Sequence, residues 1–128
     1  MFFVDFRSMK MTSTETGRRG ELFAEKYLKS IGFKIIDKNW RWRKCEIDII
    51  AIHNGTVVFL EVKTRGSSAI DEGVEIKQGQ RQRIVVAASA YLAMRVTGNM
   101  ECRFDLVRVR LSKGDWRLDH IQDVFEGA

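Results

Sequence analysis

The sequence predicts a single α/β domain in which helices flank a central sheet, and three observations carry that prediction. Apolar residues recur at helical spacing in two segments, 15–31 and 80–95. Between these segments, two short runs rich in β-branched residues stand on either side of Asn54 and Gly55, a pair typical of a two-residue hairpin turn. A chain of 128 residues is long enough to bury one core and suits one domain.

The order of the predicted elements is helix, three strands, helix and strand. Their ranges are a helix at 15–31, strands at 33–41, 47–52 and 56–62, a helix at 80–95 and a strand at 102–111. Residues 116–121 form either a last short strand or a connector. The first helix is expected to stop at Gly32. The inward faces of the two helices are predicted to carry Ala24, Tyr27, Leu28 and Ile31, and Ile84, Ala87, Ala88, Tyr91 and Leu92.

The ends and one internal segment differ in character from the predicted domain. Residues 1–12 are expected to be a disordered leader, and residues 13–128 the single domain. The polar, glycine-bearing segment 65–79 is expected to be a mobile loop. The apolar run at the start breaks at Asp5, too early for a signal peptide, and no apolar run approaches the roughly 18 residues of a membrane span. We therefore expect no contact with a membrane.

Composition narrows the class of protein further. Hydrophobic residues make up 45% and charged residues 30% of the chain, as in ordinary globular domains. The formal net charge of +5 and the pI near 9.5 suit a polyanionic partner, although many basic proteins bind no nucleic acid. Cys45 and Cys102 form no CxxC motif and have no nearby histidine, which argues against a zinc site or a disulfide framework. A reduced, cytoplasmic setting fits best.

The hairpin turn predicts which residues of its two strands are partners. If Asn54 and Gly55 are the two loop residues, Asp48 lies opposite Glu61 as a non-hydrogen-bonded pair, with Cα atoms about 4.5 Å apart. Glu46 then faces Lys63, and all four side chains share one face of the sheet. A loop of three residues would instead place the two carboxylates on opposite faces.

Two carboxylates placed opposite each other need a positive charge nearby to offset their repulsion. Both strands are otherwise apolar on both faces, as expected of central strands, so the charges of Asp48 and Glu61 would repel one another in a buried place. A hard divalent cation resolves the conflict, and Mg²⁺ commonly takes one or two carboxylates plus water and phosphate. Lys63 could then orient a water molecule and stabilise charge that develops on a phosphate. The alternative is a common polar patch in which Lys63 pairs with Glu46.

Basic side chains gather in three segments. Arg18 and Arg19 lie in the first turn of the first helix, an unfavourable position unless an anion offsets their charge, and solvated surface arginines are the equal alternative. The second segment, at the start of the second helix, carries Lys77, Gln80, Arg81 and Arg83. The third segment, 40–44, alternates tryptophan with arginine; such a pattern can stack on bases, but we favour core packing of the tryptophans. We assign no catalytic role to His53 or His120.

Together these motifs resemble one family of small bacterial proteins, the YraN family, in order over about residues 14–125. The motifs are TGRRGE at 16–21, NWR at 39–41, EIDII at 46–50, FLEVKTR at 59–65, Ala88 with Tyr91 and Leu92, CRFD at 102–105, and the ending from His120 to Phe125. That family looks like a branch of the PD-(D/E)xK, restriction endonuclease-like superfamily, close to Holliday-junction resolvases. The resemblance implies an αβββαβ core with a mixed central sheet flanked by helices.

The resemblance also implies functional residues. Asp48 and Glu61 would be metal ligands, Lys63 the catalytic lysine and Glu21 the helix-borne acid, which from spacing alone is a helix-flank residue; Glu46 is a weaker candidate. The expected cofactor is Mg²⁺ or Mn²⁺, with the Val62 carbonyl as a further ligand. The residues expected to contact nucleic acid are Arg18, Arg19, Arg65, Gln80, Arg81 and Arg83. Two positions depart from the pattern: Cys45 stands where glycine is expected and Gln80 where many relatives carry lysine.

Two functional hypotheses follow. The first is a metal-dependent nuclease that hydrolyses phosphodiester bonds, with DNA favoured and branched or damaged structures among the candidate substrates. The second is a nucleic-acid-binding protein that kept the fold and lost turnover. The complete set of Asp48, Glu61 and Lys63 favours the enzyme, because a binder needs no lysine at that position. By analogy with two-fold resolvases, a homodimer is one assembly that the resemblance allows.

Overall fold

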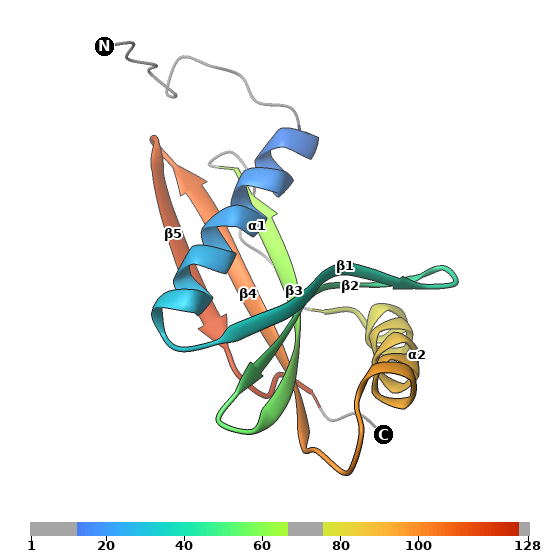
Figure 1. The fold of residues 1–128 in the computed structure, drawn as a ribbon. Helices are drawn as coiled ribbons and strands as arrows, with labels where there is room; N and C mark the ends of the chain where they lie inside the picture. Colours follow the sequence, from blue (N-terminus) through green and yellow to red (C-terminus); the bar gives the residue numbers. More distant parts are fainter. Residues whose placement is uncertain (1–12, 67–75, 126–128) are drawn as a thin grey trace.

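Two helices and a five-stranded sheet make up the fold (Figure 1). The computed structural model describes residues 13–66 and 76–125. The elements are α1 (Ser13–Ser30), β1 (Lys34–Trp42), β2 (Cys45–His53), β3 (Thr56–Arg65), α2 (Gln78–Arg95), β4 (Cys102–Ser112) and β5 (Asp115–Ile121). Every predicted element is present, the last segment is a strand, and the expected αβββαβ order is confirmed. The expected leader at 1–12 and most of the expected loop at 65–79 lie outside the described residues.

The sheet is mixed, with the strands in chain order from β1 to β5. Three neighbouring pairs are antiparallel, and β3 with β4 is parallel. A parallel pair needs a crossover, and α2 provides it. The helices cover opposite faces: Ala24 and Leu28 of α1 pack against one apolar cluster, and Ile84 and Ala88 of α2 against the other. β2 and β3 are thus apolar on both faces, as the sequence predicted for central strands.

The turn between β2 and β3 sets the register that the sequence predicts. Asn54 and Gly55 both have positive φ, 50° and 77°, as a type I′ turn requires. The pairing runs from His53 opposite Thr56 to Ile49 opposite Leu60 and ends there. The expectation that Asp48 with Glu61 and Glu46 with Lys63 continue the ladder is therefore wrong. β2 leaves β3 just before the two carboxylates would become paired.

The departure of β2 from β3 is visible in the packing and in the hydrogen bonds. Ile47 and Ile50 both belong to the α2-side cluster, although strict alternation would put them on opposite faces. The strand therefore twists at Asp48, whose Oδ2 accepts the Val62 N–H at 2.8 Å. In Figure 1, β1 and β2 run on toward α2, whereas β3 continues beside β4. A side chain thus takes over the hydrogen bond where backbone pairing ends.

Two further expectations about burial have different outcomes. Ile31 was expected to face inward, but it is 39% exposed because α1 ends at Ser30 and the chain turns through Gly32, whose φ is 93°. Core packing of the tryptophans is confirmed. Trp40 and Trp42 stack 6.4 Å apart against the α2-side cluster, and Trp40 meets Tyr91 edge-on at 5.2 Å.

Close contact between α1 and β3 fixes where α1 lies. Gly20 is buried, and a Cβ atom at this position would overlap the Thr64 side chain, with only 2.8 Å to Thr64 Cβ. Only glycine lets the helix backbone come this near to the strand. The next residue along the helix is Glu21, so this contact also sets the position of that carboxylate.

We predict that Gly20→Ala destabilises the protein by about 1–3 kcal/mol, because the added methyl group forces the helix and strand apart. Gly17→Ala is the matched control: it lies in the same helix with nothing within 4 Å of the new atom. Replacing a glycine inside a helix with alanine should stabilise the protein by about 0.5–1 kcal/mol. Urea unfolding of both variants measures the difference, and equal stabilities would show that the contact with Thr64 constrains nothing.

Candidate metal centre

Asp48 and Glu61 come together where β2 and β3 separate. Asp48 is half-buried and the Glu61 side chain is 11% exposed. Burial, and after it the charge of Asp48, raise the pKa of Glu61 to about 8, against the opposing effect of Lys63. Burial also raises the pKa of Asp48, against the hydrogen bond from Val62. Without a cation, the pair therefore holds a proton, which a hydrogen bond between the two side chains shares.

Lys63 and Gln80 complete a network around Glu61. Lys63 Nζ lies 3.4 Å from Glu61 Oε1 and donates a hydrogen bond to Gln80 Oε1 at 3.0 Å. Gln80 Nε2 donates to Glu61 Oε1 at 2.7 Å. The pairing of Lys63 with Glu46 that the polar-patch alternative expects is wrong, because Glu46 lies 3.3 Å from Arg41 and Lys63 contacts Glu61 instead. The Gln80 amide thus holds both the carboxylate and the ammonium.

Glu21 lies beside this pair rather than within it. Burial, and after it the negative charges of Asp48, Glu46 and Glu25, raise the pKa of Glu21 to about 7, while the charge of Lys38 opposes them. The side chain is therefore within electrostatic range of Asp48, as expected of a helix-borne acid. Within residues 13–66 and 76–125, no group of three His, Cys, Asp or Glu side chains is close enough to hold a metal ion.

The two carboxylates fit a magnesium site in their donor chemistry. Mg²⁺ binds through oxygen, keeps several waters and is typically held by one or two carboxylates plus phosphate, so it does not need a third acid. A cation between Asp48 and Glu61 would replace the shared proton and offset the charge of Asp48, which together with burial raises the pKa of Glu61. Ligation by the Val62 carbonyl, and by Glu21, stays a prediction.

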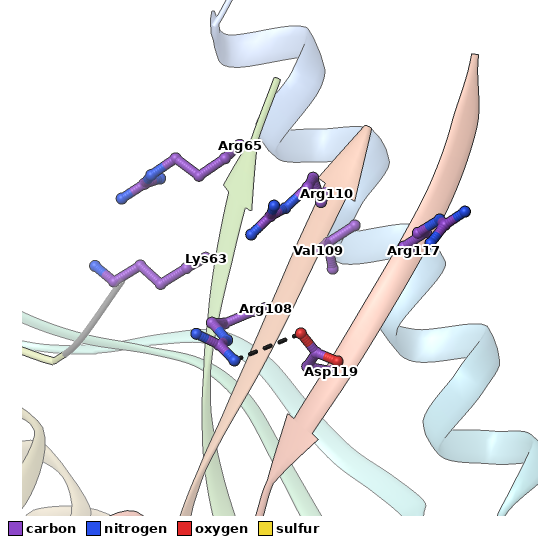
Figure 2. Close-up of a pocket in the computed structure, with 7 residues that line it drawn as sticks. All are labelled: Lys63, Arg65, Arg108, Val109, Arg110, Arg117 and Asp119. Carbon is purple, nitrogen blue, oxygen red and sulfur yellow. Dashed lines mark hydrogen bonds and ion pairs between the residues drawn. The ribbon is translucent and has the colours of Figure 1, made fainter. Parts of the chain in front are cut away.

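The basic residues predicted to touch nucleic acid are spread over both sides of the sheet. Arg18 and Arg19 are exposed on α1, and Arg83 is exposed on α2, on the opposite face. Arg81 is tied to its own surroundings: its Nε donates to the Ile76 carbonyl at 2.8 Å, and its guanidinium lies over a phenylalanine ring. Arg65, at the end of β3, lies near Lys63, since both line the same hollow (Figure 2).

Sequence reasoning missed a second buried polar cluster, centred on Asp105 of β4, which is 1% exposed. Arg103 donates to both carboxylate oxygens at 2.8 and 3.0 Å, and His120 Nε2 lies 2.8 Å from Oδ2. The Tyr27 hydroxyl lies 3.1 Å from His120 Nδ1, so the cluster links β4, β5 and α1. The spacing of Arg103 and Asp105 by two residues on a strand was a usable signal; the partner His120 was not predictable, because it lies 15 residues away.

The fold and this site define a mixed α/β protein with a buried carboxylate pair beside a lysine. The chain belongs to the family described as uncharacterised protein family UPF0102, whose sequence model matches residues 20–109, and this confirms the resemblance to the YraN family. A UPF0102 protein of Chlorobium limicola is 40% identical over 116 residues, which cover 85% of this chain and 90% of that relative. One of Hahella chejuensis is 40% identical over 114 residues, covering 88% and 91%.

A solved structure shares part of the chain path. The crystal structure of a repair endonuclease from Pyrococcus abyssi is 18% identical in sequence and superposes with a TM-score of 0.46. The match covers 84% of this chain and 42% of that chain, so this protein spans less than half of the neighbour's length.

Neither α1 nor α2, the helices of the described residues, combines the length and apolar character needed to cross a membrane.

The raised pKa values predict how the stability of the cation-free protein depends on pH. Glu61 titrates near 4.5 when unfolded and at about 8 when folded, so the folded chain binds more protons in that window. The free energy of unfolding should therefore fall as pH rises from about 4.5 to about 8. Thermal melts in EDTA across this range measure the slope, and Glu61→Gln should make it shallower.

The effect of Asp105 on stability falls in a different pH range, so it does not interfere with this test. Burial favours a higher pKa there, but hydrogen bonds from His120, Arg103 and the Asp123 N–H outweigh burial and lower the pKa below 3.8. Stability from Asp105 is thus present above pH 3.8 and is lost only as pH falls below it. A wild-type protein whose melting temperature rises between pH 5 and pH 8 would contradict the buried-pair description.

Proposed function

We propose that this protein is a metal-dependent nuclease that hydrolyses phosphodiester bonds in DNA. The observation that carries the proposal is the buried pair Asp48 and Glu61, placed where two central strands separate and joined to Lys63 through Gln80. An uncompensated pair of buried carboxylates is costly to keep in a fold unless a cation uses it. The αβββαβ order and the position of these residues on it are those expected of the PD-(D/E)xK nucleases that the family resembles.

Each side chain of the site has a distinct task in this proposal. A divalent cation, when bound by Asp48 and Glu61, would polarise the scissile phosphate and lower the pKa of water near it. Lys63 positions the attacking water and stabilises the negative charge that builds up on the phosphate in the transition state. Gln80 is a positioning residue, because its amide holds the Lys63 ammonium beside Glu61. Glu21 adds negative charge next to Asp48 and makes the site more attractive to a cation.

Lys63 is the residue that distinguishes an enzyme from a binding protein. Its ammonium is held inward, with the side chain 20% exposed, instead of extending into solvent. A lysine that only attracted phosphate would gain from exposure and would not need a carboxylate and an amide to fix its position. The alternative function, nucleic-acid binding without turnover, leaves this arrangement without a purpose.

We predict that Lys63→Ala and Asp48→Ala both lose cleavage but differ in metal binding. Lys63→Ala should slow cleavage by roughly two or more orders of magnitude, because it removes charge stabilisation from the transition state. It should still bind Mn²⁺. Asp48→Ala should lose both cleavage and Mn²⁺ binding, since it removes an oxygen ligand. Cleavage of duplex, single-stranded, flap and four-way-junction DNA gives the rates, and electron paramagnetic resonance of free Mn²⁺ gives the binding.

Matched controls are available at exposed positions. Lys29→Ala removes a lysine from the last turn of α1, and Asp115→Ala removes an acid from the start of β5; both residues are exposed. Both controls should cut and bind Mn²⁺ like the wild type. Wild-type protein that binds DNA and cuts no substrate with Mg²⁺ or Mn²⁺ would refute the enzyme and favour the binder. Normal cleavage by Lys63→Ala would refute the role given to Lys63.

A further inference from the structure

The strands β1 and β2 are joined by a short turn at their far end, which we call the β1–β2 tip and define as residues 41–45. Two residues, Arg43 and Lys44, connect Trp42 with its strand partner Cys45. In Figure 1 this end of the hairpin runs toward α2 and away from β3. The candidate metal centre uses none of these residues, although the sequence alternates tryptophan with arginine here.

Core packing accounts for only part of the Trp42 side chain. Trp42 packs against the α2-side cluster, and the Trp40 ring lies almost parallel to it, at an angle of 4°. Trp40 is in turn held edge-on by Tyr91 at 5.2 Å, so the inner member of the pair is fixed and sets the orientation of the outer one. Trp42 nevertheless remains half-buried, which leaves part of its ring at the surface.

One face of the Trp42 ring lies under a side chain that can be displaced. The Arg43 Cζ atom is 5.6 Å from the centroid of that ring, and Arg43 is exposed. A cation over an aromatic face is held only weakly at an exposed position. A flat aromatic group that offers more contact area can therefore take the place of the guanidinium on the ring.

The tip also carries positive charge around this ring. Arg41, Arg43 and Lys44 are exposed, and Arg41 lies 3.3 Å from Glu46. Arg43 adopts a φ of 58°, which glycine or asparagine would adopt with less strain, so the turn keeps a cation where another residue would be more stable. Positive charge beside an accessible tryptophan ring is the combination that binds the backbone and the bases of a nucleic-acid strand.

The tip is close enough to the candidate metal centre to contact the same nucleic-acid strand. Cys45, the partner of Trp42, precedes Asp48 by three residues on β2. A strand rises about 3.3 Å per residue, so the two positions are about 10 Å apart along β2. Phosphates of one strand in a helix are spaced about 3.4 Å apart along the axis. The Trp42 ring would therefore meet a base within a few nucleotides of the phosphate at the metal centre.

A stacking ring selects an unpaired base over a base pair within a duplex. An indole ring binds the flat face of a base, and every base offers such a face. Inside a duplex the neighbouring base pairs cover these faces, whereas single strands, flaps and junctions leave some of them open. A guanidinium that leaves the ring when a base arrives is placed to contact a phosphate next to that base.

We propose that the β1–β2 tip stacks Trp42 on an unpaired base of the DNA bound at the metal centre, and that Arg43 and Lys44 contact the adjoining phosphates. The proposal rests on the proposed function for the class of ligand, and it narrows the substrate to DNA with single-stranded or branched segments. Stacking tolerates any base, so the tip recognises the structure of the DNA and not its sequence.

The test asks whether Trp42 distinguishes single-stranded from duplex DNA. Trp42→Leu keeps an apolar side chain and removes the ring, whereas Trp116→Leu removes another half-buried tryptophan, which packs on Phe23 on the α1 side of the sheet. Fluorescence anisotropy in EDTA, with labelled oligothymidylate and a labelled duplex, measures binding without cleavage. Trp42→Leu should bind the single strand about tenfold or more weakly and the duplex almost unchanged. Trp116→Leu should bind both like the wild type.

A second measurement uses a milder substitution, in case Trp42→Leu folds poorly. Saturating oligothymidylate should quench the tryptophan fluorescence of the wild type, because stacking brings a base against the indole ring. Trp42→Phe keeps an aromatic side chain in the cluster and should lose most of this quenching, whereas Trp116→Phe should retain it. Undiminished quenching in Trp42→Phe would overturn the proposal, as would equal single-strand affinities of Trp42→Leu and Trp116→Leu.

The outcomes also separate this proposal from the nuclease activity. Single-strand binding that depends on Trp42, without any cleavage by the wild type, would support the β1–β2 tip and refute the enzyme. Cleavage by the wild type together with unchanged single-strand binding by Trp42→Leu would support the enzyme and refute the role of the tip.

Discussion

The hydrogen bond from the Val62 N–H to Asp48 Oδ2 lies at the point where β2 and β3 separate, and the arrangement of the candidate site depends on it. Backbone pairing between β2 and β3 stops at Ile49 and Leu60, and an unpaired amide in a buried strand would be costly. Asp48 satisfies that amide with a side chain, so β2 can turn away toward α2. The opening that results brings a charged Asp48 next to Glu61 and keeps backbone from filling the space between them.

Several features of the site are consequences of that opening. Glu61, Lys63 and Arg65 follow one another on one face of β3, beyond the point where β2 stops pairing with it. β4 and β5 extend this face with basic side chains that line a hollow together with Lys63 and Arg65. Gln80, at the start of α2, closes the other side and sets the distance between Glu61 and Lys63. A neutral amide thereby binds both the Glu61 carboxylate and the Lys63 ammonium, which lie 3.4 Å apart.

The local parts of this arrangement could be read from the sequence, and the non-local parts could not. Asn54 and Gly55 determine a turn by their own backbone preferences, so the first five pairs of the hairpin follow. The pairing ends where Ile47 joins the same cluster as Ile50 on the α2 side, and such a departure from strict alternation is not visible in a local pattern. The hollow beside Lys63 and Arg65 forms only when β3, β4 and β5 lie in this order, which requires the parallel crossover between β3 and β4. The candidate residues Asp48, Glu61 and Lys63 could be selected from the sequence because two short strands and one turn contain all three.

Calorimetric titration of Mn²⁺ in buffers of different ionisation enthalpy tests the central claim most directly, since it counts the protons that leave when a cation enters. With a Glu61 pKa of about 8, binding at pH 7 should release roughly one proton per ion, and the affinity should rise with pH. Glu61→Gln should abolish that release. Tight Mn²⁺ binding with no proton release at pH 7, or no binding between pH 7 and pH 9, would contradict the account.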